Sequence, residues 1–149
     1  MNLNDLQAFA HSIIENNRAE CDFVEYKKSY QQEDKILKTI CAYANNFMNR
    51  DYGYLFIGIE EQDDKTNDIK AIPVRPITGL LEGQLEVAEN HIKSLFKYIQ
   101  PKPNCHFISD QIDGKWYLVV IVEPSNRLTE VTEKGANATK LLKVDVIFV

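Results

Sequence analysis

The sequence predicts an α/β fold in which a mixed β-sheet of about five to six strands is flanked by three helices. Three segments carry apolar residues at helical spacing. Residues 52–59 are almost wholly apolar, which is typical of a central strand buried on both faces. Two further strands are joined by Asp113 and Gly114, a strong hairpin signal. Because 149 residues is an ordinary length for one domain, we expect residues 1–149 to form a single unit.

The three helices are predicted over residues 4–15, over a segment that follows Asp34 as N-cap and reaches about Met48, and over residues 84–98. The second has the clearest apolar stripe, with a period close to 3.6 residues. Aspartate is a favourable N-cap because its carboxylate can accept a hydrogen bond from the first turn. Pro101 ends the third helix, since proline cannot continue one.

The first strand is predicted over residues 22–28, where apolar and polar residues alternate. Val24 and Tyr26 share the face that we assign to the core. Glu25 and Lys27 share the opposite face with Phe23.

Other strands follow along the chain. A polar turn over residues 62–67 leads into a strand at residues 69–73, which predicts a hairpin. Further strands are expected at residues 105–112, 115–122 and 143–149.

Composition restricts the function. The net charge of −5 counts against a generally basic nucleic-acid-binding surface but allows a local basic face. The three cysteines form no CxxC pair, and Cys105-His106 lacks the further ligands of a zinc site. No glycine-rich nucleotide-binding motif and no nucleophile motif occurs. No apolar run is long enough to span a bilayer and no signal peptide is apparent, so we expect a cytoplasmic protein.

Acidic residues gather at the ends of two predicted strands. Glu20 precedes the first strand, Glu25 lies within it, and Glu60 follows the central strand beside Glu61. Glu20 and Glu25 are five residues apart, so they converge only if Glu20 lies in the preceding loop or a bulge intervenes. Carboxylates can hold Mg²⁺ or Mn²⁺, and Lys27 could offset phosphate charge. The pattern therefore fits a metal-dependent phosphodiester site with Glu20, Glu25 and Glu60 as ligands, but equally a solvated strand face and a polar turn.

Basic residues gather around the first strand and the second helix: Lys27, Lys28, Lys35, Lys38 and Arg50. Together with Tyr26 and Tyr30 they could contact a phosphate backbone, with the aromatic rings stacked on bases. An ordinary surface, on which Glu33, Asp34 and Asp51 balance these charges, explains the pattern as well.

Three segments carry a family resemblance. Residues 20–27 resemble the opening signature of the AlbA-type domain of the Schlafen family, a Glu followed five residues later by Glu-Phe-Lys. Residues 36–45 are similar to the family's helix, which ends in an Ala-Phe-Ala-Asn-like sequence. Residues 54–61 resemble its glycine-led strand ending in Ile-Gly-Val-Asp-Asp. The matches occur in order over roughly residues 20–127, whereas residues 128–149 form a divergent C-terminal segment.

The resemblance implies an AlbA-like domain that binds DNA or RNA, in bacteria often within proteins that look like transcription regulators. In some vertebrate members a three-carboxylate site cleaves RNA, and by motif position this site maps onto Glu20, Glu25 and Glu60. Three functions stay open: nucleic-acid binding through the basic residues, metal-dependent ribonuclease activity, and self-assembly as a homo-oligomer or protein-interaction module. The acidic composition favours assembly over nucleic-acid binding, and the spacing of Glu25 and Lys27 favours the ribonuclease over assembly. An exposed apolar C-terminal strand would favour pairing with a second chain.

Overall fold

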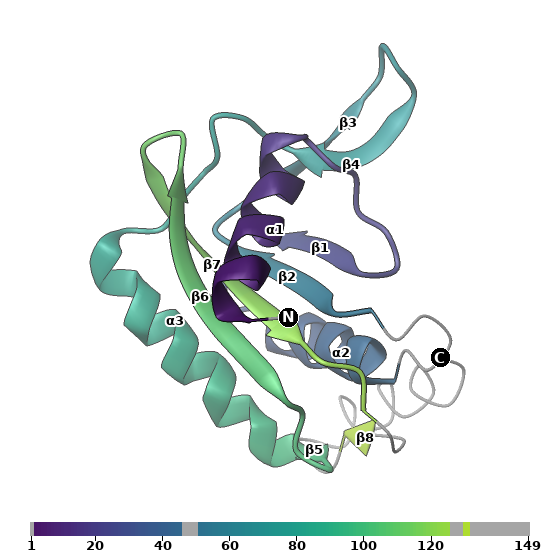
Figure 1. The fold of residues 1–149 in the computed structure, drawn as a ribbon, viewed down its shortest axis with the longest axis vertical. Helices are drawn as coiled ribbons and strands as arrows, with labels where there is room; N and C mark the ends of the chain where they lie inside the picture. The colour runs from purple at the N-terminus through teal and green to yellow at the C-terminus, as the bar shows by residue number, and fades with distance from the viewer. Residues whose placement is uncertain (1, 46–50, 126–129, 132–149) are drawn as a thin grey trace.

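The computed structural model describes residues 2–45, 51–125 and 130–131 of the chain. Its helices and strands, in chain order, are α1 (Leu3–Glu15), β1 (Val24–Lys27), α2 (Glu33–Ala44), β2 (Gly53–Ile57), β3 (Glu61–Asp64), β4 (Ile69–Pro73), α3 (Glu82–Ser94), the 3-10 helix η1 (Leu95–Tyr98), β5 (Ile99–Gln100), β6 (Cys105–Ile112), β7 (Lys115–Val122) and β8 (Glu130–Val131). The predicted combination of three α-helices and a mixed sheet is confirmed (Figure 1).

The main sheet has four strands in the order β1-β2-β7-β6. β1 runs parallel to β2, whereas β7 runs antiparallel to both of its neighbours. The remaining strands form two separate pairs, β3 with β4 and β5 with β8. The hairpin of β3 and β4 projects from the body instead of extending the sheet (Figure 1).

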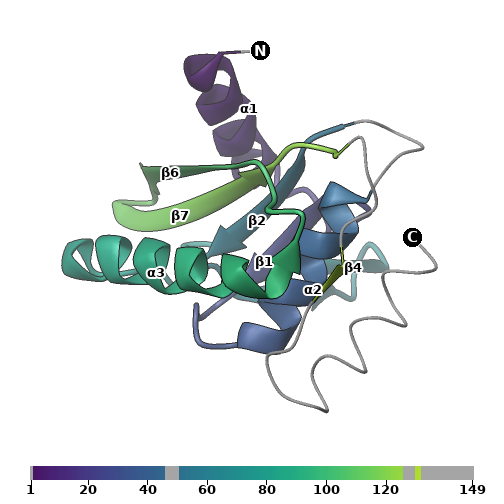
Figure 2. The ribbon, with the colours of Figure 1, turned by 90° about the horizontal axis from the view of Figure 1, so that it is seen from below.

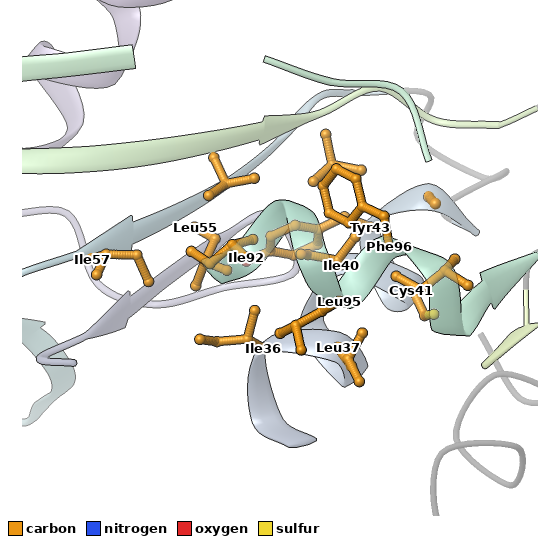
Figure 3. Close-up of a cluster of buried hydrophobic side chains, with 14 of the residues drawn as sticks. Ile36, Leu37, Ile40, Cys41, Tyr43, Leu55, Ile57, Ile92, Leu95 and Phe96 are labelled. Atoms are coloured by element: carbon orange, nitrogen blue, oxygen red, sulfur yellow. The ribbon is translucent and has the colours of Figure 1, made fainter. Parts of the chain in front are cut away.

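β2 is the buried centre of the molecule, as its apolar run predicts. All five of its residues are buried. Leu55 and Ile57 face a core shared with α2 and α3, whereas Tyr54 and Phe56 face a core shared with α1. The sheet is therefore covered by α1 on one face and by α2 and α3 on the other (Figure 2). Figure 3 shows the core on the α2 and α3 side.

β1 is an edge strand whose two faces differ as predicted. Val24 and Tyr26 are buried in the core on the α1 side. Glu25 and Lys27 are half-buried. Since successive side chains alternate across a strand, these two project from the face that carries α2.

The helix starts only partly match the sequence. Asn2 caps α1, because its side chain accepts a hydrogen bond from the Asp5 amide at 2.9 Å. α2 begins one residue before Asp34, after Gln32, so the assignment of Asp34 as N-cap is wrong. Asp34 lies instead in the first turn, where a carboxylate still interacts favourably with the helix dipole.

Two turns are confirmed. Asp113 and Gly114 adopt φ angles of +58° and +73°, as a two-residue turn between antiparallel strands requires. The other predicted hairpin also forms, although its first strand takes in residues expected to belong to the turn. The strand predicted at residues 143–149 and the helix end at Met48 lie outside the described residues. Within the described parts of the chain, no helix combines the length and apolarity needed to cross a bilayer.

Candidate nucleic-acid interface

A cavity of about 420 Å³ opens between β1 and α2. Three lysines and two acids contribute to its lining: Lys27, Lys35, Lys38, Asp22 and Glu25. These charges give the cavity a net charge of +1 in a chain of net charge −5. The cavity is therefore a locally basic region, as the clustering of lysines in the sequence suggests.

The two elements supply these side chains for simple geometric reasons. Residues 35, 38, 39 and 42 of α2 lie at the i, i+3, i+4, i+7 spacing of one helix face. This face lies beside the apolar stripe that packs on the sheet. β1 contributes Glu25 and Lys27 from the strand face turned toward α2. The amides of Gly58 and Ile59 both donate to the Lys27 carbonyl, at 2.8 and 3.2 Å, which fixes the end of β1 against the exit of β2.

Glu25 and Lys27 form an ion pair, with 2.9 Å between Oε1 and Nζ. The side chains are 28% and 15% exposed, so solvent screens the pair only partly. The acid holds the lysine in one place on the strand. The spacing of two residues predicts that Glu25 and Lys27 share a face, and on that face the two side chains are in direct contact.

Glu20 lies in the segment before β1, and it turns back to the outer edge of that strand. Its Oε2 accepts a hydrogen bond from the Tyr26 amide at 2.9 Å, and its own amide donates to the Ala71 carbonyl at 2.9 Å. The Tyr26 amide points away from β2 in the parallel pairing. Glu20 therefore satisfies a donor that an edge strand would leave open.

The pKa of the Glu20 carboxyl is raised to about 8, chiefly by burial and then by a hydrogen bond with Glu61. The Tyr26 amide opposes this rise, and the charges of Glu25 and Glu61 add to it. From the sequence, Glu20 can approach Glu25 if it lies in the loop before the first strand. Glu20 does lie before β1, which begins at Val24.

Glu60 follows the end of β2, as the sequence predicts. Its side chain is exposed, and its carbonyl accepts a hydrogen bond from the Val74 amide at 2.8 Å. Its neighbour Glu61 is the residue bonded to Glu20. The chain turns at Gly58, where φ is +96°.

The carboxylates do not form a metal-binding group as they stand. Across residues 2–45 and 51–125, no cluster of three or more His, Cys, Asp or Glu side chains has an arrangement that could hold a metal ion. Carboxylate oxygens are suitable donors for Mg²⁺ or Mn²⁺. A metal-ligand role for Glu20, Glu25 and Glu60 stays a prediction.

The other basic residues lie at or near the same region. Lys28 is exposed directly after β1, and Lys38 is exposed on α2. Arg50 lies outside the described residues. Lys35, which the sequence places in the basic cluster, also lines the cavity.

Tyr26 and Tyr30 are the two tyrosines that the sequence analysis expects to stack on bases. Tyr26 is only 2% exposed, and its hydroxyl donates to the Arg18 carbonyl at 2.5 Å. The expectation that it stacks on bases is therefore wrong, because its ring belongs to the core. Tyr30 is half-buried and packs edge-on against His91, with 5.6 Å between ring centroids.

Tyr43 lines the cavity. The sequence analysis did not single it out as a site residue, and it stands there only within the helix segment 36–45. Its side chain is 4% exposed. Within the described part of the chain, its buried hydroxyl has no hydrogen-bond partner. Burial, and then the charges of Glu25 and Cys21, raise its pKa well above the usual range, so the phenol stays protonated.

Comparison with known proteins identifies the family. No curated protein matches the chain. The Schlafen, AlbA_2 family matches residues 20–142. The fold is similar to the solution structure of the N-terminal domain of a protein from Nitrosomonas europaea that is named as related to the ATP-dependent DNA helicase RecG. That likeness has a TM-score of 0.65 and 21% identity, and it covers 85% of this chain and 82% of that one.

A second likeness is to the crystal structure of the DIP2311 protein from Corynebacterium diphtheriae. It has a TM-score of 0.50 and 18% identity, and it covers 87% of this chain and 24% of that one. At these identities both likenesses describe the fold alone. The family match extends over most of the chain and includes every segment that carried the resemblance in the sequence. The chain belongs to the Schlafen AlbA_2 family.

Proposed function

We propose that this domain binds nucleic acid through the cavity between β1 and α2 and through the adjoining Lys28. The observation that carries the proposal is the convergence of Lys27, Lys35 and Lys38 from two elements in an otherwise acidic chain. Lysines are common phosphate ligands, and phosphate contacts supply most of the sequence-independent affinity for nucleic acids.

Two further observations support this function. The family match and the naming of the Nitrosomonas relative for a DNA helicase both favour a nucleic-acid-related role. The proposal keeps the predicted residues Lys27, Lys28 and Lys38 and adds Lys35. Arg50 remains a sequence-based candidate.

The test is binding as a function of salt. Fluorescence anisotropy with labelled RNA and DNA, single-stranded and duplex, should show log K falling linearly with log salt concentration. Two or three phosphate contacts predict a slope of about −2 to −3. Lys38→Ala should reduce the magnitude of the slope by about one. Lys70→Ala is the matched control, because Lys70 on β4 is 79% exposed and lies outside the cavity. The proposal is wrong if the native chain binds no nucleic acid at low salt.

A metal-dependent ribonuclease is the second candidate. It is favoured by the proximity of Glu20 to Glu25 and by the ion pair between Glu25 and Lys27. The predicted set also includes Glu60. The assay is cleavage of labelled single-stranded and structured RNA with Mg²⁺ or Mn²⁺. Activity that is lost in Glu25→Ala and kept in Glu86→Ala, a change on the exposed surface of α3, would support it.

A further inference from the structure

Arg18 is a cation outside the cavity whose backbone is held in place by two elements. It follows Asn17, which adopts a φ of +51° just after α1. The Arg18 amide donates to the Ile13 carbonyl at 3.0 Å, an arrangement that commonly ends a helix beside a residue with positive φ. The Arg18 carbonyl accepts a hydrogen bond from the Tyr26 hydroxyl at 2.5 Å. The backbone of Arg18 is therefore anchored to α1 and to β1.

The Arg18 side chain lies on an aromatic ring. Its Cζ atom is 4.6 Å from the centroid of the Phe23 ring, and the residue is exposed. Among the residues that the structure describes, the guanidinium has no ion pair and no hydrogen bond. The Arg75 guanidinium, by contrast, bonds Asp113 and two further groups. Within the described chain, Arg18 thus presents five N–H donors and the side of its plane that faces away from the ring to solvent.

Phe23 belongs to a tight turn that leads into β1. Cys21 and Val24 exchange backbone hydrogen bonds at 3.1 and 3.4 Å, so the chain doubles back between them. The turn takes Phe23 out of the regular alternation of the strand. Its half-buried ring packs against the core on the α1 side, so the prediction that it shares the face of Glu25 is wrong.

This turn connects the ring to the basic cavity. Cys21 and Asp22 line the cavity, and Phe23 is the next residue. The ends of a four-residue turn lie within about 7 Å of each other, so the pair of Arg18 and Phe23 lies close to the cavity. In Figure 1, the segment between α1 and β1 lies at the β1 edge of the sheet. A strand with a phosphate among the cavity lysines would therefore have a base within reach of Arg18.

A nucleobase suits this pair of side chains. Bases of single strands stack on aromatic rings and on guanidinium planes. Bases inside a duplex are already stacked on one another and present only their edges in the grooves. A phosphate would use the charge of Arg18 but not the ring beneath it. The planar cation on a ring, next to three lysines, therefore favours a single strand over a duplex.

We propose that Arg18, supported by Phe23, is a stacking platform for one base of a single-stranded nucleic acid whose phosphate lies in the cavity. The guanidinium stacks on the base, the ring holds the guanidinium flat, and the cavity lysines offset the phosphate charge. The inference rests on the proposed function, because the lysines hold the strand, and it adds the class of nucleic acid that is bound. Every base has a flat face, so the platform accepts any of them.

The first test is anisotropy with the full chain, using labelled oligothymidine and a duplex of equal length. Arg18→Lys keeps the positive charge but removes the planar group. It should weaken binding of the single strand by roughly fivefold or more, the loss expected for one stacked base, and leave the salt dependence unchanged. Lys97→Ala is the matched control, because Lys97 also lies over a ring, that of Tyr98 at 5.1 Å, but does not line the cavity. Its affinity should equal that of the native chain.

The second test removes the bases and keeps the phosphates. The native chain should prefer oligothymidine to a fully abasic strand of equal length by roughly fivefold or more. Arg18→Lys and Phe23→Leu should both lose this preference. Phe23→Leu keeps an apolar side chain on the core, and Arg18→Lys changes only an exposed side chain, so its urea midpoint should match that of the native chain.

The outcomes separate this inference from the proposed function. If Arg18→Lys binds like the native chain while Arg18→Ala is weaker, Arg18 contacts phosphate through its charge, and the platform is overturned. Equal native affinity for oligothymidine and the abasic strand, or for the single strand and the duplex, also overturns it. In each of these cases a weaker Lys38→Ala leaves the proposed function standing. Absence of any binding by the native chain overturns both.

Discussion

Replacing Gly53 with alanine tests the packing that holds Tyr43 in place. The added Cβ would lie 2.2 Å from two ring atoms of Tyr43 and 2.6 Å from its Cβ. Ordinary carbon contacts are about 3.5–4.0 Å, so the ring or the strand must move by more than about 1 Å. Neither moves easily, because Tyr43 is 4% exposed and β2 is hydrogen-bonded on both sides. Overpacking of this kind costs about 1–3 kcal/mol, and we expect about 3 kcal/mol here.

The assay is urea unfolding followed by circular dichroism and by the fluorescence of Trp116. With an m-value of about 2 kcal/mol/M, the expected loss lowers the midpoint by about 1.5 M. Gly83→Ala is the matched control. Gly83 lies in the first turn of α3, and a Cβ there would meet no atom within 4 Å. Because alanine is a better helix former than glycine, this variant should be unchanged or more stable by up to about 1 kcal/mol.

A Gly53→Ala protein as stable as the native one would refute the reasoning, because it would mean that the Tyr43 ring does not occupy the space above the glycine. The double variant Gly53→Ala/Tyr43→Ala adds a second check. Removing the ring removes the clash, so the cost of Gly53→Ala should shrink by about 1–2 kcal/mol in that background. Strict additivity of the two single changes would contradict a direct steric conflict.

Two further predictions concern ionisation. Because the folded protein keeps a proton on Glu20 that the unfolded chain releases above its pKa of 4.5, stability from this group is full below pH 4.5 and is lost as pH rises toward 8. Glu20→Gln should remove that decline, which urea unfolding near pH 5 and near pH 9 would measure. An equal difference in the free energy of unfolding between native protein and variant at both pH values would contradict the idea. The pKa of Asp113 is lowered chiefly by its hydrogen bond from Arg75, so its contribution is present above the unfolded pKa of 3.8 and is lost as pH falls through the folded value. Asparagine tolerates the positive φ of this position, so Asp113→Asn should lower the free energy of unfolding by about 1–2 kcal/mol at neutral pH through loss of the ion pair. The difference should vanish in acid. A loss that persists at about pH 2 would argue against the ion pair.

Local sequence patterns predict the parts of this fold that depend on local rules. β6, β7 and their turn were predictable because Asp113 and Gly114 accept positive φ and a strongly apolar run follows the turn in β7. β2 was predictable because its composition shows burial on both faces. β5 and β8 were not, since each has two residues and forms only by pairing with a segment about thirty residues away. Nothing local in either segment marks such a partner.

The same distinction applies to the site. The common face of Glu25 and Lys27 follows from the two-residue period of a strand. Their meeting with Lys35 and Lys38 depends on how α2 packs across the sheet. The hydrogen bond between Glu20 and Glu61 joins the loop before β1 to β3, a contact between distant segments that the residue types do not determine.

An acidic chain can still bind phosphate, because the distribution of charge matters more than its sum. Residues 60–73, which include the β3–β4 hairpin, carry five acidic and two basic residues, a net charge of −3. The hairpin projects from the body in Figure 1. At physiological ionic strength, exposed charges separated by more than about 8 Å are largely screened. On the proposed function we therefore expect affinity at the cavity to be governed by its own three lysines and two acids, and the net charge of −5 to act mainly through slower encounter with a polyanion at low salt. The raised pKa of Glu20 strengthens this separation, since a carboxyl that keeps its proton more readily carries less negative charge beside Glu25.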